Sequence, residues 1–163
     1  METKLILYHG SNQNFDAVDL SKSKDKRDFG RGFYTTTLRE QAQDWAEALF
    51  DRYKGNGIFV YEMELDITND LLVKSYEGLS EEWLLMVQKN RTLGGLQHKF
   101  DIVQGPVAND KTARTIALYI AGIIDVNEAL QRLKFNQVNN QVSLHTPSAL
   151  SHLTLLRKYA NER

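Results

Sequence analysis

Residues 29–37 read Phe-Gly-Arg-Gly-Phe-Tyr-Thr-Thr-Thr, and this stretch carries the strongest signal about the fold. Its two glycines permit a tight turn, and the aromatic and β-branched residues that follow favour a short strand. Upstream, residues 4–9 form a short apolar run that ends at the turn residues Gly10-Ser11-Asn12, a pattern typical of a buried strand. Between them, residues 20–28 are polar and charge-dense, and we expect a loop there.

The rest of the chain alternates between helical and strand patterns. Apolar and small residues at helical spacing predict a helix over residues 38–54, which Gly55-Asn56-Gly57 would end. The other predicted strands are 58–65, 100–104 (ended by Gly105-Pro106), 141–145 and a short one within 69–77. The other predicted helices are 80–93, 110–123, 126–134 and a last one from Pro147 or Ser148 to about Lys158. No linker or repeat divides the chain, so we expect one α+β domain over residues 1–163.

Composition excludes several classes of function. The chain has 163 residues, no cysteine and a formal net charge of −1. Disulfides, thiolate metal sites and cysteine nucleophiles are therefore impossible, and the scattered histidines lead us to expect no metal. The charge balance does not suggest a strongly basic nucleic-acid binder, although a local patch would suffice for such a target. We find no signal peptide and no apolar stretch of membrane-spanning length, so we expect a cytoplasmic protein that does not enter a membrane.

Three side chains suggest a ligand site from their residue types alone. His9, at a strand end before Gly10-Ser11, either offers a ring nitrogen to a ligand or is a half-buried histidine satisfied by a carbonyl group. Tyr34 and Trp45 are either core aromatics or two walls of a cleft that holds a flat, electron-poor ring. Both interpretations stay open at the level of single residues.

Taken together, these segments resemble a known family. Leu7 to Ser11 and Phe29 to Tyr34 resemble the His-Gly-Ser/Thr and Phe-Gly-x-Gly-x-Tyr motifs of the diphtheria-toxin-like ADP-ribosyltransferases, which include the poly(ADP-ribose) polymerase catalytic domains. The chain is also similar to small uncharacterised bacterial proteins near this superfamily, which share a run like residues 101–110. The resemblance implies an ADP-ribosyltransferase-like split β-sandwich with flanking helices, and NAD as the substrate.

The resemblance also assigns roles in binding NAD. It implies that His9 holds the NAD ribose and that the backbone of Gly10 binds the nicotinamide amide. Tyr34 and Trp45 would stack against the nicotinamide, although the family usually has tyrosine at the second position. A family serine that bonds the amide is Ala42 here. The other residues expected to contact NAD are Ser11, Arg31, Gly32 and Thr36.

The third family motif is a catalytic glutamate that opens a late strand. Residues 140–144 resemble that strand, but Gln141 stands in the glutamate's place, so the triad reads His9, Tyr34, Gln141. Asp110 is either a substrate-contacting or catalytic residue or the cap of the helix that follows it. Several cations could meet the pyrophosphate: Arg31 and the loop residues Lys22, Lys24, Lys26 and Arg27. Because charge runs are usually solvated, we favour only Arg31.

The chemistry of the motif leads to several functional hypotheses. Glutamine can accept a hydrogen bond from a ribose hydroxyl but supplies no charge to the oxocarbenium-like transition state. The first hypothesis is a mono-ADP-ribosyltransferase that modifies a macromolecular acceptor, protein or nucleic acid, and acts as a bacterial toxin restrained by an antitoxin protein. The alternatives are a catalytically silent NAD or ADP-ribose binding module, an NAD glycohydrolase, and a structural protein in which His9 and Tyr34 are buried in the core. Under the first hypothesis, Asp101 or Asp110 is a candidate to replace the missing carboxylate.

Overall fold

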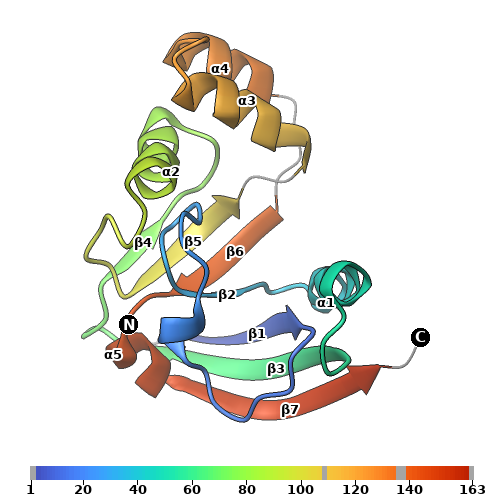
Figure 1. Cartoon of the computed structure of the whole chain (residues 1–163). Coiled ribbons are helices and arrows are strands. Elements are labelled where there is room, and N and C mark those ends of the chain that lie inside the picture. Colours follow the sequence, from blue (N-terminus) through green and yellow to red (C-terminus); the bar gives the residue numbers. More distant parts are fainter. Residues whose placement is uncertain (1–2, 108–109, 135–138, 162–163) are drawn as a thin grey trace.

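A computed structural model describes residues 3–107, 110–134 and 139–161 of the chain (Figure 1). The strands are β1 (Thr3–Ser11), β2 (Phe33–Thr35), β3 (Ile58–Ile67), β4 (Val73–Ser75), β5 (Ile102–Val107), β6 (Asn139–Leu144) and β7 (Leu153–Asn161). The α-helices are α1 (Arg39–Tyr53), α2 (Glu81–Leu93), α3 (Asp110–Ile120), α4 (Val126–Leu133) and α5 (Pro147–Ser151), and a 3₁₀ turn, η1, covers Leu20–Lys22. The mixed α+β class predicted from the sequence is confirmed.

The described strands form two sheets that lie one above the other in Figure 1. The lower sheet has three strands in the order β1-β3-β7, all antiparallel. The upper sheet has four strands in the order β2-β6-β5-β4, and only β4 and β5 run parallel. Helix α1 packs on the lower sheet, whereas α2, α3 and α4 stand over the upper sheet.

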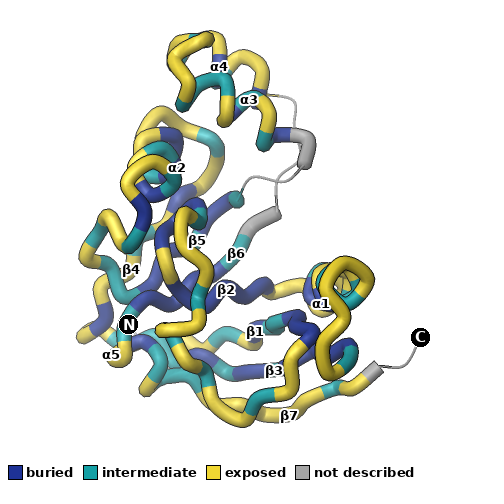
Figure 2. The backbone as a smooth tube through the Cα atoms, viewed as in Figure 1, coloured by how far each residue is buried: buried dark blue, intermediate teal, exposed yellow. Residues whose placement is uncertain are grey.

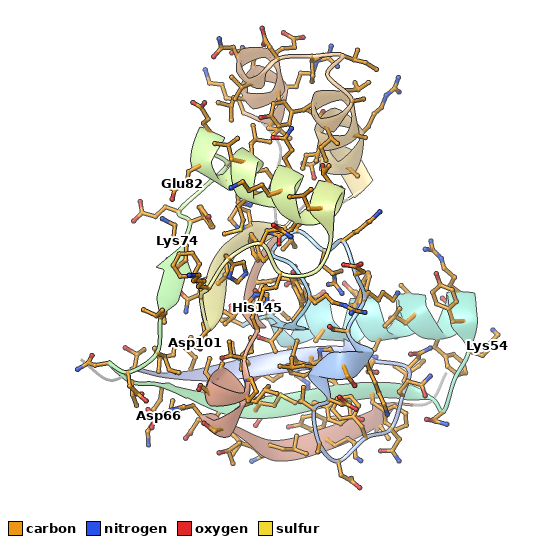
Figure 3. The ribbon with its side chains drawn as sticks, turned by 60° about the vertical axis from the view of Figure 1, so that its left-hand side comes forward. Lys54, Asp66, Lys74, Glu82, Asp101 and His145 are labelled. Atoms are coloured by element: carbon orange, nitrogen blue, oxygen red, sulfur yellow. The ribbon has the colours of Figure 1, made fainter. Side chains whose placement is uncertain are left out.

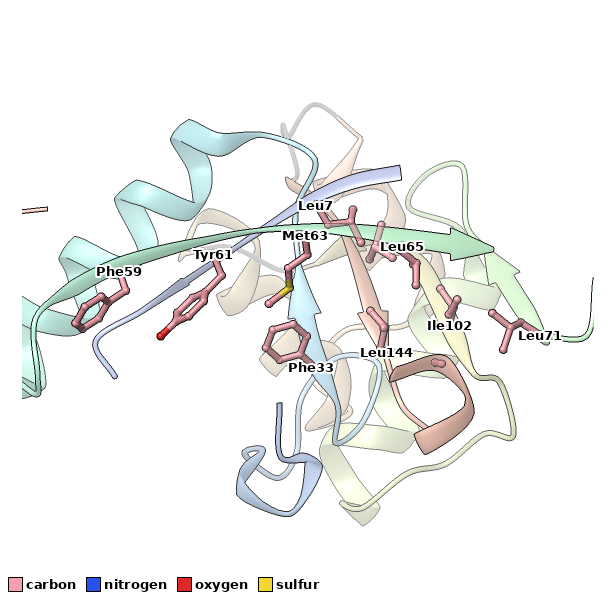
Figure 4. Packing of buried hydrophobic residues seen from close by; sticks show 11 residues of the cluster. Leu7, Phe33, Phe59, Tyr61, Met63, Leu65, Leu71, Ile102 and Leu144 are labelled. Atoms are coloured by element: carbon pink, nitrogen blue, oxygen red, sulfur yellow. The ribbon is translucent and has the colours of Figure 1, made fainter. Parts of the chain in front are cut away.

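Side chains that point between the two sheets make the first hydrophobic core (Figure 4). Leu7, Met63 and Leu65 come from the lower sheet, and Ile102 and Leu144 come from the upper one. All five are at most 2% exposed. Because successive side chains of a strand point to opposite faces, alternate residues of the upper strands are left to face the helices.

Those alternate residues make the second core, between the upper sheet and the helices. Tyr34 and Val103 come from the sheet, and Trp83, Ile116 and Leu133 come from α2, α3 and α4. The central strands of the upper sheet are thus buried on both faces (Figure 2). The Ser80 side chain caps α2 as predicted, by accepting a hydrogen bond from the Trp83 backbone N–H, and Lys74 of β4 pairs with Glu82 at 2.5 Å (Figure 3).

The two sheets meet at one backbone bridge. Tyr8 and Thr36 exchange two hydrogen bonds, N–H to O at 2.7 and 2.9 Å, just beyond the end of β2. Two residues further along β1, Gly10 lies directly against α1. A Cβ atom on Gly10 would stand 1.9 Å from the carbonyl oxygen of Ala42, so the close approach of strand and helix requires glycine.

Two predicted segments differ in the structure. The predicted stop at Gly105-Pro106 is wrong, because β5 continues through both residues to Val107. The carbonyl group of Pro106 accepts a hydrogen bond from Trp83 Nε1 at 2.6 Å, so its backbone faces away from β6 and the missing N–H costs no ladder bond. In the part of the chain that the structure describes, no helix is long and apolar enough to cross a membrane.

The predicted last helix is also wrong. Helix α5 ends at Ser151 after little more than one turn, and Leu153–Asn161 form strand β7. This strand pairs along the free edge of β3, with Leu153 opposite Leu65 and Tyr159 opposite Val60. Pairing with a strand that lies far away in the sequence therefore outweighs the local helical pattern.

We predict that Gly10→Ala destabilises the fold by about 2–4 kcal/mol, because the added methyl group must push the backbone of α1 away from β1. Chemical denaturation measures the change. Gly78→Ala is the matched control, since a Cβ atom there meets nothing within 4 Å, and it should change stability by less than about 0.5 kcal/mol. Equal effects of the two substitutions would contradict the packing argument.

Candidate functional site

An open groove of about 1750 Å³ runs between α1 and the segment that joins β1 to β2. This volume exceeds the ~300–1000 Å³ typical of small-molecule pockets, so the groove has room for a dinucleotide. Eight of the sequence-predicted residues line it, namely His9, Gly10, Ser11, Gly32, Tyr34, Thr36, Trp45 and Gln141. They come from β1, β2, α1, β6 and the loop before β2, so folding gathers them from distant parts of the chain.

Two of the predicted residues are not among those that line the groove. Arg31 is exposed, and its backbone is tied elsewhere, with the N–H donating to Gly95 O at 2.9 Å and the carbonyl oxygen bonded to His145 Nδ1 at 2.7 Å. The geometry gives no support for Arg31 as the pyrophosphate contact. Asp110 begins α3, but its side chain lies outside the described residues.

His9 is oriented by the strand next to it. Its Nδ1 lies 2.7 Å from the carbonyl oxygen of Tyr34, and its ring stacks on Phe33 with centroids 4.2 Å apart. A carbonyl group can only accept, so Nδ1 carries the proton and the neutral ring keeps Nε2 as an acceptor. Burial lowers the pKa of His9 to about 4, and the positive charge of Arg27 also acts to lower it. At neutral pH the imidazole is therefore uncharged and can accept a hydrogen bond from a hydroxyl group.

Tyr34 is buried to 7% exposure, as the structural-protein hypothesis predicts for this residue. Its hydroxyl donates to Gly30 O at 2.7 Å and accepts from the Phe29 N–H at 2.9 Å. A side chain that lines the groove buries part of the Tyr34 ring, because the guanidinium of Arg27 lies 4.0 Å from the ring centroid. His9 is half-buried and its Nδ1 is bonded to a carbonyl group, which is the geometry that the non-ligand interpretation of this histidine predicts.

The loop that carries Arg27 is anchored to the end of α2. Asp28 pairs with Arg91, with Oδ1 2.5 Å from Nη2 and 2.7 Å from Nε. Asp25 accepts a hydrogen bond from the Gly95 N–H at 2.6 Å. These bonds restrict the conformations that the loop can adopt, and they hold its basic side chains at one wall of the groove.

Two further histidines bond the backbone carbonyl groups of residues 29 and 31, directly after this loop. His145 is 6% exposed, and its Nε2 lies 2.7 Å from Ser143 Oγ while its Nδ1 bonds Arg31. His98 bonds Phe29 O through Nε2 at 2.8 Å, and the two imidazole rings meet edge to face at 4.6 Å. Burial lowers the pKa of His145 to about 4. His145 lies beside Asp101, whose carbonyl oxygen accepts its backbone N–H at 2.9 Å (Figure 3).

The open edge of β1 presents backbone groups to the groove. Tyr8 uses its N–H and carbonyl group to reach Thr36, so both point away from β3. Backbone direction repeats every second residue along a strand, and the N–H and carbonyl group of Gly10 therefore point the same way, beyond the bridge. Ser11 and Thr36 are committed locally: the Ser11 hydroxyl accepts the Gln13 N–H, and the Thr36 hydroxyl bonds Gln41.

Helix α1 forms the aromatic wall of the groove. Leu38, Ala42, Trp45, Leu49 and Tyr53 follow one another at spacings of three or four, and all five line the groove. This spacing places them on one face of the helix. Trp45 is 51% exposed, which leaves much of its indole ring accessible to a ligand.

The late strand β6 contributes Gln141, which lies opposite Gly105 of β5 and lines the groove. Asp101 is not among the residues that line the groove, and its two oxygens accept hydrogen bonds from the Leu72 N–H at 2.8 Å and the Thr146 hydroxyl at 2.6 Å. It ties the start of β5 to the end of β6 instead. Within the described residues, no group of three or more His, Asp or Glu side chains is arranged to hold a metal ion.

Sequence reasoning missed the cations and histidines that build the loop. Arg27 was grouped with solvated charges, yet it covers Tyr34, while Arg91 and His98 had no assigned role. The charge run at residues 22–27 was the available signal, because four of its six residues are basic and its acidic residue, Asp25, is used in anchoring. Little in the local sequence marks Arg91 or His98, since the groups through which they hold the loop, Asp28 and the Phe29 carbonyl group, lie more than 60 residues away.

Comparison with known proteins gives one family. The model of a family described as "Protein of unknown function (DUF3990)" matches residues 5–155, which include every groove-lining residue that the sequence predicted. No curated protein matches the chain.

We predict that stability falls as the pH drops from about 6.5 to about 4. The unfolded chain takes up protons on histidine near pH 6.5, whereas burial delays protonation of folded His9 and His145 to about pH 4. His145→Gln should reduce the slope of unfolding free energy against pH by about 1.4 kcal/mol per pH unit in this window. Denaturant titrations at several pH values measure it. Ser143→Ala keeps the imidazole and should keep the slope, so an equal loss in both variants would contradict the assignment.

Proposed function

The chain belongs to the DUF3990 family, whose description gives no function, and we propose that it is an NAD-dependent mono-ADP-ribosyltransferase. The observation that carries the proposal is that one groove gathers His9, Tyr34 and Gln141, together with Trp45. These residues match the three sequence motifs and arrive from β1, β2, β6 and α1. A set of unrelated core residues would have no reason to converge on one open groove.

We further propose that the fold is an ADP-ribosyltransferase-like split β-sandwich. Its support is the pair of sheets, which are joined at the Tyr8–Thr36 bridge and separate beyond it. The groove begins where the sheets separate, between the Gly10 end of β1 and the Gln141 end of β6. The helices flank both sheets, as the resemblance implies.

The nicotinamide end of NAD would bind at the open edge of β1. The Gly10 N–H and carbonyl group form a donor–acceptor pair that matches a carboxamide. Tyr34 and Trp45 supply aromatic surface, and each stacking contact is worth about 1 kcal/mol. Ala42 offers no hydroxyl to the amide, so backbone groups must provide its recognition.

The ribose would lie between His9 and Gln141. The neutral His9 ring offers Nε2 as an acceptor for a ribose hydroxyl, and the Gln141 carboxamide offers a second acceptor. Nicotinamide departs as a neutral molecule, so bond cleavage needs no general acid. The protein must instead orient the ring, exclude water and stabilise positive charge on the ribose. Gln141 performs the last task with a dipole rather than a charge, which costs about 2–4 kcal/mol of transition-state stabilisation.

That deficit favours a second candidate, a module that binds NAD or ADP-ribose without cleaving it. The specific observation is that Gln141 is neutral and that Asp101 is committed to Leu72 and Thr146. An NAD glycohydrolase differs from the transferase in using water as the acceptor, and from the binding module in cleaving NAD. The resemblance adds two points to the proposal. ADP-ribose is transferred to a macromolecular acceptor, and the protein acts as a cytoplasmic toxin that an antitoxin protein restrains.

Labelled NAD tests the choice among the three. We predict that the purified protein, incubated with NAD labelled in the adenylate part and a cell lysate, leaves label on a macromolecule. Label found only as free ADP-ribose would indicate a glycohydrolase, and intact NAD would indicate a binding module. The same reaction with His9→Ala is the control, and it should lose the transfer because the ribose loses an acceptor.

We predict that Gln141→Glu raises nicotinamide release by roughly 30- to 1,000-fold, because a carboxylate supplies the charge that the oxocarbenium-like state lacks. Chromatography of nicotinamide after incubation with NAD measures it. Gln104→Glu is the matched control on the neighbouring strand, where the side chain meets Ser75 outside the groove. No release from either variant would count against a tuned active site and favour the binding module.

Trp45 gives a direct readout of binding. The second tryptophan, Trp83 of α2, is fully buried, whereas Trp45 lies half exposed in the groove. We predict that NAD quenches tryptophan fluorescence and that Trp45→Phe loses most of the quenching while it still binds NAD by calorimetry. Quenching that persists in Trp45→Phe would place the nicotinamide away from α1.

A further inference from the structure

The Tyr34 ring is already in contact with a cationic side chain. The guanidinium carbon of Arg27 lies 4.0 Å from the centroid of the Tyr34 ring, which is the distance of a stacked cation–π contact. Arg27 and Tyr34 are both among the residues that line the groove. The rings of His145 and Phe29 lie farther away, with centroids 6.1 and 6.4 Å from that of Tyr34.

The backbone around Arg27 is fixed, so its position is not that of a loose surface arginine. Asp25, two residues before it, accepts hydrogen bonds from the N–H groups of Lys26 and Gly95 at 2.8 and 2.6 Å. Lys26 adopts a left-handed backbone with φ +58°, a conformation that persists only where the surroundings hold it. Asp28, on the other side, pairs with Arg91. The side chain of Arg27 is thus the movable part of a rigid turn.

The N–H groups of the Arg27 guanidinium are available to bind a ligand. Among the described residues it forms no ion pair and no hydrogen bond, in contrast to Arg91, which Asp28 neutralises. Stacking uses the face of the guanidinium and leaves its in-plane N–H groups available for a bidentate anion. Its charge also reaches His9, where it acts with burial to lower the pKa.

We propose that Arg27 competes with the nicotinamide ring for the face of Tyr34, and that NAD displaces it because the pyrophosphate accepts the released guanidinium. This inference rests on the proposed function, since it assumes that NAD binds in the groove. Two planar groups cannot share one ring face, and the nicotinamide ring of NAD is itself cationic, so it repels an arginine beside it. The ring therefore enters only when the guanidinium leaves.

The consequence is selection for the intact dinucleotide. Free nicotinamide carries no phosphate, so it must displace Arg27 without offering the guanidinium a new partner. NAD and ADP-ribose both offer a pyrophosphate, a bidentate acceptor for which arginine is well suited. After the glycosidic bond breaks, return of Arg27 to Tyr34 would help to expel the neutral nicotinamide. Arg27 is thus a specificity-determining residue of the groove.

Calorimetric titration with two fragments of NAD tests the proposal, because its two parts predict opposite changes. Arg27→Ala should raise the affinity for nicotinamide about three- to tenfold, since the ring face becomes free. It should lower the affinity for ADP-ribose about tenfold or more, since the phosphate contact is lost. Arg31→Ala, the same residue type on the same loop but exposed and outside the groove, is the matched control and should change neither affinity.

A second variant keeps the test valid if the alanine variant folds poorly. Arg27→Lys retains the charge but has no planar group to stack, so it should bind nicotinamide more tightly than the wild type and keep most of its affinity for ADP-ribose. Affinities that stay unchanged, or that move in the same direction for both fragments, would overturn the role of Arg27 and leave the proposed function standing. A wild-type protein that binds neither ADP-ribose nor NAD would remove the proposed function, and this inference with it.

Discussion

Two backbone hydrogen bonds between Tyr8 and Thr36 determine how the rest of the groove is built. They fix the edge of β1 against the end of β2, and they hold His9 where its ring reaches the Tyr34 carbonyl oxygen. The same register turns the backbone of Gly10 toward the groove and its Cα toward α1. Because β1 and α1 approach so closely there, Trp45 lies one helical turn beyond Ala42 on the facing wall. A shift of one residue at this bridge would reverse every side chain of β1.

Most of the fold could be predicted because its signals are local. Turn residues bound β1, a Ser80 cap begins α2, and apolar periodicity marks each helix before α5. The errors come from interactions that join distant parts of the chain. Pro106 stays in a strand because Trp83, 23 residues earlier, bonds its carbonyl oxygen. Likewise, the segment after Ser151 becomes a strand because β3 offers a free edge, which no window of sequence reveals.

The site shows the same division between local and distant signals. The resemblance to family motifs singled out His9, Tyr34 and Gln141, and the structure gathers them in one groove. Arg31 was favoured over the loop cations because charge runs are usually solvated, yet Arg31 is exposed and is not among the residues that line the groove. Arg27 takes a place there instead, because the turn around it is set by Arg91 and Gly95 of a helix end far along the chain. The motif therefore identifies which segment takes part in the site. Contacts with distant parts of the chain decide which side chains of that segment line the groove.

Charge is distributed unevenly along the groove, and this distribution bears on what the groove can bind. Basic side chains of the loop, with Arg27 foremost, suit a pyrophosphate, while the inner end holds the neutral groups His9 and Gln141. A histidine with an ordinary pKa would be partly cationic near neutral pH and would repel the cationic ring of NAD. Burial removes that repulsion by lowering the pKa of His9 to about 4. The inner end is thus compatible with a cation without attracting one strongly. Under the proposed function, binding of NAD and cleavage of NAD would therefore be separable, and residue 141 would govern cleavage more than binding.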